Sequence, residues 1–283
     1  MTNPALPLSG QAALITGGAT GIGLACARHL LRDGATVTIA GRREDRLRES
    51  ADALTAEAPA GATVQWVRCD TALEDEVAAA VAAASEPLGG LHLALASAGI
   101  GGLGPIITTS LEEWNSILGT NLTGTFLLFK HAGAAIARAG GGAMAAISSI
   151  AAADTHRFMA PYCVSKAGID SLVANAADEL GVAGIRVNSV RPGLVDTELV
   201  EMILAEDGTT ASYLANMPVS RVGVVDDIAA AVRYLLGPES AWVTGVHLSV
   251  DGGHHLRCGP DYEPVARMLF GDAVDGKLPA AEA

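Results

Sequence analysis

The stretch from Ala12 to Gly23 reads AALITGGATGIG, an apolar run followed directly by a glycine-rich turn. The run has the length of a buried strand, and residues 21–32 have the periodicity of a helix. Such a turn lets the backbone approach a phosphate, which the N–H groups at a helix N-terminus can bind. A tight strand-to-helix turn also needs glycine for steric reasons alone. The strand–turn–helix order favours a phosphate site, whose predicted residues are Gly17, Ala19, Thr20, Gly21, Ile22 and Gly23.

Further apolar runs alternate with helix-length segments along the chain. They are apolar at nearly every position, as expected of strands that helices cover on both faces in a parallel sheet. The predicted strands are residues 12–16, 36–40, 63–68, 91–96, 143–148, 185–190 and 246–250. We therefore predict an α/β fold with a doubly wound, seven-stranded parallel sheet of the Rossmann type, forming a single domain over residues 1–257.

Two segments depart from this alternation. Residues 195–222 are long and mixed in character, and we expect them to form a lid over a site at the carboxyl ends of the strands. Residues 258–283 form a C-terminal extension with several prolines and the apolar cluster Met268-Leu269-Phe270. This extension either closes the pocket or is disordered, and the sequence leaves both open.

Composition excludes several classes of partner. A net charge of −13 disfavours nucleic acids and anionic membranes, which select basic surfaces. No basic leader and no apolar run of about 18 residues is present, so we expect a cytoplasmic protein without a membrane partner. The adjacent His254 and His255 have no ligand set beside them, and we expect no metal site. The cysteines have neither zinc-site nor disulfide spacing: Cys26, Cys69, Cys163 and Cys258.

The end of the second predicted strand bears on the choice of cofactor. An acidic residue there would bind ribose hydroxyls and repel a 2'-phosphate, but the chain has Arg42 and Arg43 instead. Guanidinium groups bind phosphate in a bidentate manner, so we predict that NADP(H) is preferred and leave NAD(H) open. The same arginines would also suit a solvated helix start. Asp70, after the third strand, is placed either to bind an adenine amine or to cap the next helix.

Tyr162 and Lys166 are four residues apart in a helical segment, so both lie on one face. A phenol has a usual pKa of about 10 and is a poor base at neutral pH. An ammonium about 4 Å away would interact with the phenolate by roughly 4 kcal/mol, enough to lower its pKa by about three units. The spacing predicts that Tyr162 exchanges a proton with the substrate while Lys166 lowers its pKa and holds the nicotinamide ribose. Ser149, directly after a predicted strand, can stabilise charge on the substrate oxygen.

Together these motifs resemble the short-chain dehydrogenase/reductase family over about residues 8–253. The resemblance rests on T-G-x-x-x-G-x-G, Asp70, Asn121, Ser149, Tyr162-x-x-x-Lys166 and Pro192-Gly193. It implies a catalytic set of Asn121, Ser149, Tyr162 and Lys166, with Asn121 helping to hold a water that relays protons to Lys166. It also implies further cofactor contacts, by Ala98, Gly99, Pro192, Gly193, Val195 and Thr197.

One position departs from the family pattern. The family usually has Asn-Asn-Ala-Gly after the fourth strand, whereas this chain has Ala96-Ser97-Ala98-Gly99. The change removes amides that would brace the central strands, and Ser97 is expected to replace them only in part. The helical segments 122–139 and 162–180 are apolar on more than one face, which together with the resemblance implies a homotetramer or homodimer.

The sequence thus predicts an oxidoreductase that transfers a hydride between NADP(H) and a carbonyl or secondary alcohol. Apolar residues in the lid favour a small to medium, lipophilic substrate. Two alternatives stay open: a non-catalytic NADP-binding sensor or scaffold, and an epimerase or dehydratase of the same superfamily. Net turnover of the cofactor is expected of the oxidoreductase and distinguishes it from both alternatives.

Overall fold

The computed structural model describes residues 6–257, together with Met268 and Asp275. One sheet of seven parallel strands organises this part of the chain, in the order β3-β2-β1-β4-β5-β6-β7. The strands are β1 (Ala12–Thr16), β2 (Thr36–Gly41), β3 (Val64–Arg68), β4 (Leu93–Ala96), β5 (Gly142–Ile147), β6 (Ile185–Pro192) and β7 (His247–Val250). The predicted fold class is confirmed, the bounds of β1 are as predicted, and those of the other strands differ from the predicted ones by at most two residues at either end.

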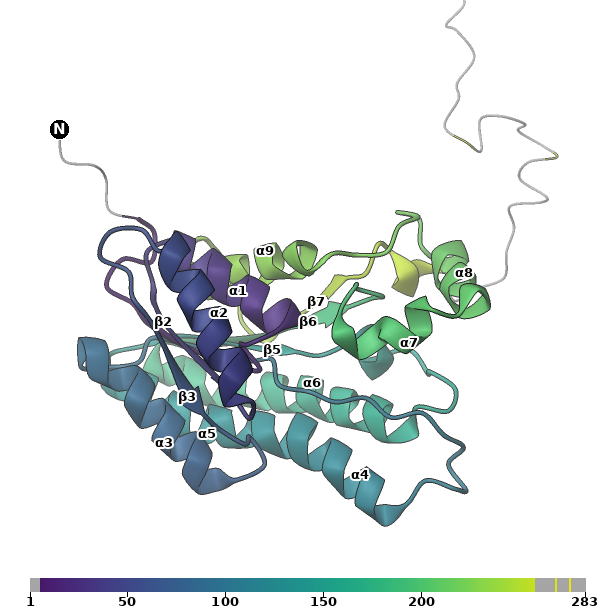
Figure 1. The fold of residues 1–283 in the computed structure, drawn as a ribbon, viewed down its shortest axis with the longest axis horizontal. Coiled ribbons are helices and arrows are strands. Elements are labelled where there is room, and N and C mark those ends of the chain that lie inside the picture. The colour runs from purple at the N-terminus through teal and green to yellow at the C-terminus, as the bar shows by residue number, and fades with distance from the viewer. Residues whose placement is uncertain (1–5, 258–267, 269–274, 276–283) are drawn as a thin grey trace, which may run out of the picture.

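Helices cover both faces of the sheet (Figure 1). They are α1 (Gly21–Arg32), α2 (Glu44–Glu57), α3 (Glu74–Ser85), α4 (Leu111–Leu118), α5 (Gly124–Arg138), α6 (Ala160–Leu180), α7 (Glu201–Leu204), α8 (Asp207–Asn216) and α9 (Val225–Leu236). The two long helical segments predicted at 122–139 and 162–180 correspond to α5 and α6.

The apolar strands supply two cores because successive side chains point to opposite faces. In β1, Ala13 and Ile15 pack with α1, α2 and α9, whereas Ala12 and Leu14 pack with α3, α5 and α6. Leu14 itself lies beside Thr38 of β2 and Ala94 of β4 in the sheet. Burial on both faces explains why the strands lack the polar alternation of a half-exposed sheet.

The strand order reverses direction between β1 and β4. From β1 the chain runs outward through β2 to β3, then returns to place β4 on the other side of β1. The connections after β1 and β4 therefore leave on opposite faces, which opens a crevice at their carboxyl ends. This crevice is where the fold positions a ligand.

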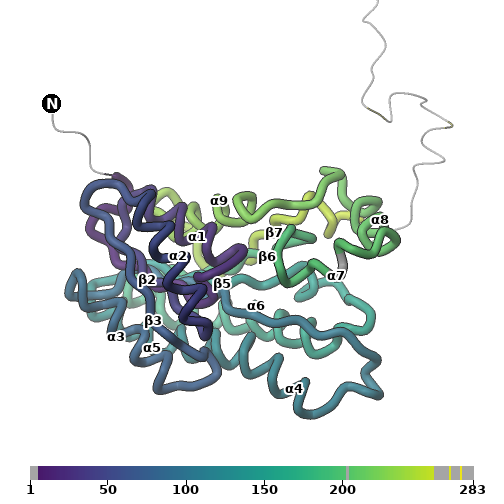
Figure 2. The backbone as a smooth tube through the Cα atoms, viewed as in Figure 1, coloured from purple at the N-terminus to yellow at the C-terminus, as the bar shows by residue number. Residues whose placement is uncertain are grey.

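The predicted lid segment, residues 195–222, is largely helical. It contains a 3₁₀ turn at Glu198–Val200, then α7 and α8, and Val195 forms an isolated bridge with Gly223 at its base. Figure 2 shows α7 and α8 at the edge of the molecule away from α2 and α3. Apart from Met268 and Asp275, the extension 258–283 lies outside the described residues, and its role stays a prediction.

Within the described part of the chain, no helix is both long enough and apolar enough to cross a membrane.

Gly23 tests how closely α1 packs on the preceding turn. A Cβ at this position would lie 2.2 Å from the carbonyl oxygen of Gly17. We expect Gly23→Ala to lower the free energy of unfolding by about 1–3 kcal/mol, because the backbone must shift to admit the methyl group. Chemical denaturation followed by circular dichroism measures the change. Gly181→Ala is the control, since a Cβ there meets no atom within 4 Å; equal stability of the two variants would contradict the packing argument.

Candidate active site

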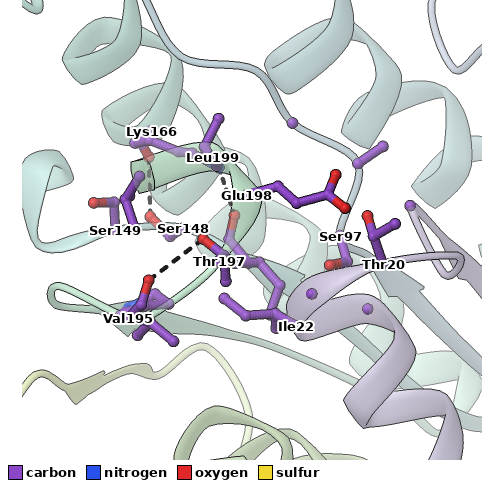
Figure 3. A pocket seen from close by; sticks show the side chains of 18 of the residues that line it. Thr20, Ile22, Ser97, Ser148, Ser149, Lys166, Val195, Thr197, Glu198 and Leu199 are labelled. Carbon is purple, nitrogen blue, oxygen red and sulfur yellow. Dashed lines mark hydrogen bonds between the residues drawn. The ribbon is translucent and has the colours of Figure 1, made fainter. Parts of the chain in front are cut away.

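A cleft at the carboxyl edge of the sheet runs from the glycine turn to the first residues of the segment 195–222 (Figure 3). Most of the predicted site residues line it: Gly17, Thr20, Gly21, Ile22, Gly23, Ala98, Gly99, Ser149, Tyr162, Lys166, Pro192, Gly193, Val195 and Thr197. Five predicted residues do not line it: Ala19, Arg42, Arg43, Asp70 and Asn121.

The glycine turn forms one end of the cleft. Gly17 has φ +67°, and a Cβ there would lie 2.7 Å from the amide nitrogen of Ala98, so the turn packs directly on the chain after β4. Gly21, with φ +51°, begins α1. Thr20 is the N-cap of α1, but its side chain makes no capping hydrogen bond. The first N–H groups of α1 therefore remain available to a phosphate, and the turn fits the diphosphate of a dinucleotide.

Ser149 and Tyr162 meet at the other end of the cleft. Ser149 follows β5 and is the N-cap of a short 3₁₀ turn, where its hydroxyl accepts a hydrogen bond from the Ala151 amide at 3.1 Å. Tyr162 lies in the first turn of α6 and is hydrogen-bonded to the Ser149 side chain. Two hydroxyl groups from different elements therefore lie together where a substrate oxygen can contact both.

Lys166 is buried one helical turn after Tyr162. Its Nζ donates to the carbonyl oxygen of Ile147 at 2.8 Å and lies 5.5 Å from the centre of the Tyr162 ring. Asp170, a further turn along α6, accepts hydrogen bonds from Arg191 Nε at 2.7 Å and Ser189 Oγ at 2.8 Å. Burial lowers the pKa of Lys166 to about 8, against the opposing effect of the Asp170 carboxylate.

The predicted lowering of the Tyr162 pKa is wrong for this structure. Burial raises the pKa of Tyr162 above its usual value, and the group that opposes this effect is Ser149, through its hydrogen bond. The prediction assumed a tyrosine screened only moderately from water, whereas both side chains are desolvated and the ammonium is bonded to Ile147. Tyr162 therefore keeps its proton at neutral pH.

Asn121 lies behind the cleft rather than in it. It is fully buried in a π-helical turn, Gly119–Thr123, between α4 and α5. Its Oδ1 accepts from the Ile100 amide at 2.8 Å, and its Nδ2 donates to the Ile100 carbonyl at 3.0 Å and to Ser165 Oγ at 3.0 Å. The side chain thus ties the segment after β4 to α6. Its part in holding a water stays a prediction.

The brace between β1 and β4 comes from Thr16. Its hydroxyl donates to the Leu95 carbonyl at 3.4 Å and accepts from the Ser97 amide at 3.3 Å, while that amide also donates to the Thr16 carbonyl at 3.2 Å. The Ser97 side chain lines the cleft instead. Thr16 therefore links β1 to the end of β4, where this chain lacks the amide side chains of the usual pattern.

The basic and acidic residues predicted at the cofactor end lie outside the cleft. Arg42 and Arg43 are exposed between β2 and α2, and Arg43 Nη2 lies 3.5 Å from Glu198 Oε2 of the lid. Asp70 accepts a hydrogen bond from the Ala72 amide at 3.0 Å, in the turn before α3, while Leu73 is the N-cap of α3. The carbonyl oxygen of Ala19 accepts a hydrogen bond from Ser50 Oγ at 2.9 Å.

Comparison with known proteins identifies the family. A family model described as enoyl-(acyl carrier protein) reductase matches residues 17–255. Cis-4-hydroxycyclohexanecarboxylate dehydrogenase from Sinomonas cyclohexanicum is 36% identical over 245 residues, which cover 86% of this chain and 96% of that protein. D-threitol dehydrogenase from Mycolicibacterium smegmatis is 36% identical over 253 residues, covering 88% of this chain and 95% of that protein.

A solved structure agrees with these relatives. The structure of a short-chain type dehydrogenase/reductase from Mycobacterium ulcerans superposes with a TM-score of 0.87 at 39% identity, covering 96% of this chain and all of that one. The chain belongs to the short-chain dehydrogenase/reductase family. The predicted resemblance is confirmed, and with it an oxidoreductase that acts on CH–OH or C=O groups. Membership implies a nicotinamide dinucleotide as cofactor and a small molecule as substrate.

The short-chain dehydrogenase/reductase cleft continues into a second hollow that the sequence did not reveal. Ser149 and Tyr162 line it together with His156 from the loop before α6 and Tyr213 from α8. His156 and Tyr213 belong to no recognisable motif, because the segments that contain them meet only in the folded chain. Asp170 was also missed, although its spacing of four from Lys166 was a signal. Among the described residues, no group of three His, Cys, Asp or Glu side chains is arranged to hold a metal ion.

The depressed pKa of Lys166 predicts a pH-dependent contribution to stability. Between about pH 8 and the ordinary lysine value of 10.5, the unfolded chain binds the Lys166 proton and the folded chain does not. The free energy of unfolding therefore rises with pH across this window, by about 3 kcal/mol from this group alone. Lys166→Met removes the effect, so its stability relative to the parent protein should fall as the pH rises from 8 to 10.5.

Denaturant titrations of both proteins at several pH values measure this difference. Lys130→Met, which removes an exposed lysine paired with Glu74, is the matched control. Parallel stability curves for the parent protein and Lys166→Met would show that the Lys166 pKa is not depressed.

Proposed function

We propose that this protein is an NADP(H)-dependent oxidoreductase that interconverts a secondary alcohol and a carbonyl, with Ser149, Tyr162 and Lys166 as its catalytic residues. The observation that carries the proposal is the hydrogen-bonded pair of Ser149 and Tyr162 at one end of a cleft whose other end is the glycine turn. A dinucleotide bound along the cleft would bring its reactive end to this pair.

The cleft contains the groups that a dinucleotide needs. The turn from Gly17 to Gly23 and the N-terminus of α1 would hold the diphosphate, while Ala98, Gly99 and the segment from Pro192 to Thr197 would contact the nicotinamide half. Lys166 would hold the nicotinamide ribose. When bound, the nicotinamide supplies or accepts the hydride.

Tyr162 carries the proton in this proposal. The raised pKa keeps its phenol protonated at neutral pH, which suits proton donation to a carbonyl oxygen as the alcohol forms. Ser149 donates a hydrogen bond to the same oxygen and stabilises the charge that develops there. Donation leaves a phenolate, which the nearby Lys166 ammonium favours, and in the oxidation direction this phenolate takes the proton of the alcohol and becomes a phenol again.

The preference for NADP(H) is supported by the end of β2. The chain has Gly41, Arg42 and Arg43 there, so two guanidinium groups and no carboxylate stand at the position that reads the adenosine ribose. Both arginines are exposed, and Arg43 is engaged only with Glu198 through an ion pair of 3.5 Å among the described residues. The 2'-phosphate of NADP(H) could displace the Glu198 carboxylate from this solvated ion pair.

We also propose a homotetramer or homodimer in the cytoplasm, with residues 195–222 as the lid of the substrate site. Large apolar side chains remain exposed on the two long helices, Phe126 of α5 at 47% and Val164 of α6 at 45%. Trp242, near the edge strand β7, is 99% exposed. Surfaces of this kind support association of identical chains.

Tyr162→Phe tests the catalytic role. The loss of the phenol proton should lower kcat for carbonyl reduction by about a hundred- to ten-thousandfold and leave cofactor affinity nearly unchanged. Nicotinamide absorbance over a panel of ketones and secondary alcohols gives kcat, and fluorescence titration gives cofactor affinity. Tyr234→Phe, on the exposed face of α9, is the control. Full activity of Tyr162→Phe would refute the catalytic role of Tyr162, whereas the absence of turnover by the parent protein would favour the non-catalytic alternative.

Replacing Arg42 and Arg43 together by Ala tests the cofactor preference. Loss of charge-assisted hydrogen bonds to the 2'-phosphate should weaken NADPH binding by about ten- to a hundredfold and leave NADH binding unchanged. Arg48→Ala controls for the loss of charge on α2, since Arg48 stacks on Trp66. Tighter binding of NADH than of NADPH by the parent protein would refute the preference.

A further inference from the structure

The second hollow of the cleft has one wall that the catalytic residues do not use. Its polar lining side chains are Ser149 and Tyr162, together with His156 and Tyr213. The remaining lining is mostly apolar, from Ile150, Met159, Leu194, Leu199 and Val200. A substrate whose oxygen lies on Ser149 and Tyr162 can therefore reach a second pair of polar side chains in the same, mostly apolar hollow.

His156 is oriented to accept a hydrogen bond. Its Nδ1 lies 3.0 Å from the carbonyl oxygen of Asp154, an acceptor, so Nδ1 carries the proton and the other ring nitrogen of the neutral imidazole has a free lone pair. Within the described residues, Nε2 has no hydrogen-bond partner. The loop that presents this ring contains Phe158, the one non-glycine residue with positive φ in the described chain, at +69°. Strain of this kind is concentrated at functional sites.

Tyr213 supplies a donor beside it. Its ring lies 6.2 Å from the His156 ring and meets the edge of His254 at 5.3 Å, so the lid tyrosine is held between two histidines. Its proximity also raises the pKa of Tyr162, so the two phenols share one space. Among the described residues, the Tyr213 hydroxyl has no hydrogen-bond partner.

A donor beside an acceptor matches a hydroxyl group, which both accepts and donates. A carboxylate can only accept hydrogen bonds, so it would be repelled by the lone pair on Nε2 of His156. In the part of the chain that the structure describes, the side chains that line the hollow also include no arginine or lysine that could pair with an anion. Arg157, the nearest cation in the loop, stacks on Phe158 and does not line the hollow. An anionic group is therefore disfavoured here.

We propose that His156 and Tyr213 form a recognition site for a second hydroxyl group, so that the substrate is a neutral hydroxyketone or diol with an apolar frame between its two oxygens. The inference rests on the proposed oxidoreductase function and names its substrate class. Tyr213 selects the substrate and takes no part in proton transfer.

The test compares cyclohexanol with the three positional isomers of cyclohexanediol, cis and trans, and with 4-hydroxycyclohexanecarboxylate. Oxidation with the preferred cofactor gives kcat/KM for the parent protein, Tyr213→Phe, His156→Phe and the control Tyr234→Phe. We expect at least one diol to exceed cyclohexanol by about tenfold, the effect of one well-placed hydrogen bond. Tyr213→Phe and His156→Phe should remove this advantage through KM, with a larger loss on the diol than on cyclohexanol.

Three results would overturn the inference while the oxidoreductase function stands. They are turnover of cyclohexanol with no advantage for any diol, an equal loss on cyclohexanol and diols in Tyr213→Phe, and preference for the carboxylate over every diol. An absence of turnover by the parent protein on all these alcohols and on their ketones would instead refute the proposed function, and the inference with it.

Discussion

The contact between Gly23 and the carbonyl oxygen of Gly17 is the constraint on which the site depends. With no side chain at residue 23, α1 starts directly above the end of β1, and Gly17 can then pack on the Ala98 amide. This arrangement directs the first N–H groups of α1 into the crevice between β1 and β4. The lid is built against the same turn, since a Cβ at Gly21 would lie 3.5 Å from the Thr197 side chain. One close backbone approach thus positions the predicted phosphate site, the crevice and the segment 195–222 together.

At the other end of the cleft, burial shifts the pKa values of the side chains more than neighbouring charges do. The helix places Tyr162, Lys166 and Asp170 on one face, yet desolvation raises the pKa of the phenol and lowers that of the ammonium. Each side chain is thereby shifted toward its neutral form, and a neutral phenol is a proton donor. The buried ammonium is still tolerated because Ile147 accepts its hydrogen bond and Asp170 offers an opposite charge. The stability lost by burying Lys166 is the expected cost of a preorganised site.

Sequence reasoning predicted the fold well because its signals are local. Continuous apolar runs and a glycine turn at a strand end require only the chain nearby, and the strands lie where these runs predicted. The positions of Ser149, Tyr162 and Lys166 follow from the same regularity. The sign of the Tyr162 pKa shift could not be predicted, because it depends on how much water the whole fold excludes. His156 and Tyr213 were missed for a similar reason, since only tertiary packing joins their segments.

The acidity of the lid gives the two ends of the cleft different electrostatic requirements. Glu198 lines the cleft and pairs with Arg43 at 3.5 Å, and Figure 3 shows its side chain extending toward Ser97 and Thr20. An exposed pair of this kind contributes little, whereas a bidentate phosphate–guanidinium contact is stronger, so a 2'-phosphate at Arg43 would displace the carboxylate. Glu198 would then lose its counter-charge, and the negative charge of residues 195–222 would be less compensated while the substrate binds. This negative charge would repel an anionic substrate but not a neutral one. Binding of a phosphorylated cofactor and selection of an uncharged hydroxyl compound are therefore compatible properties of the same segment.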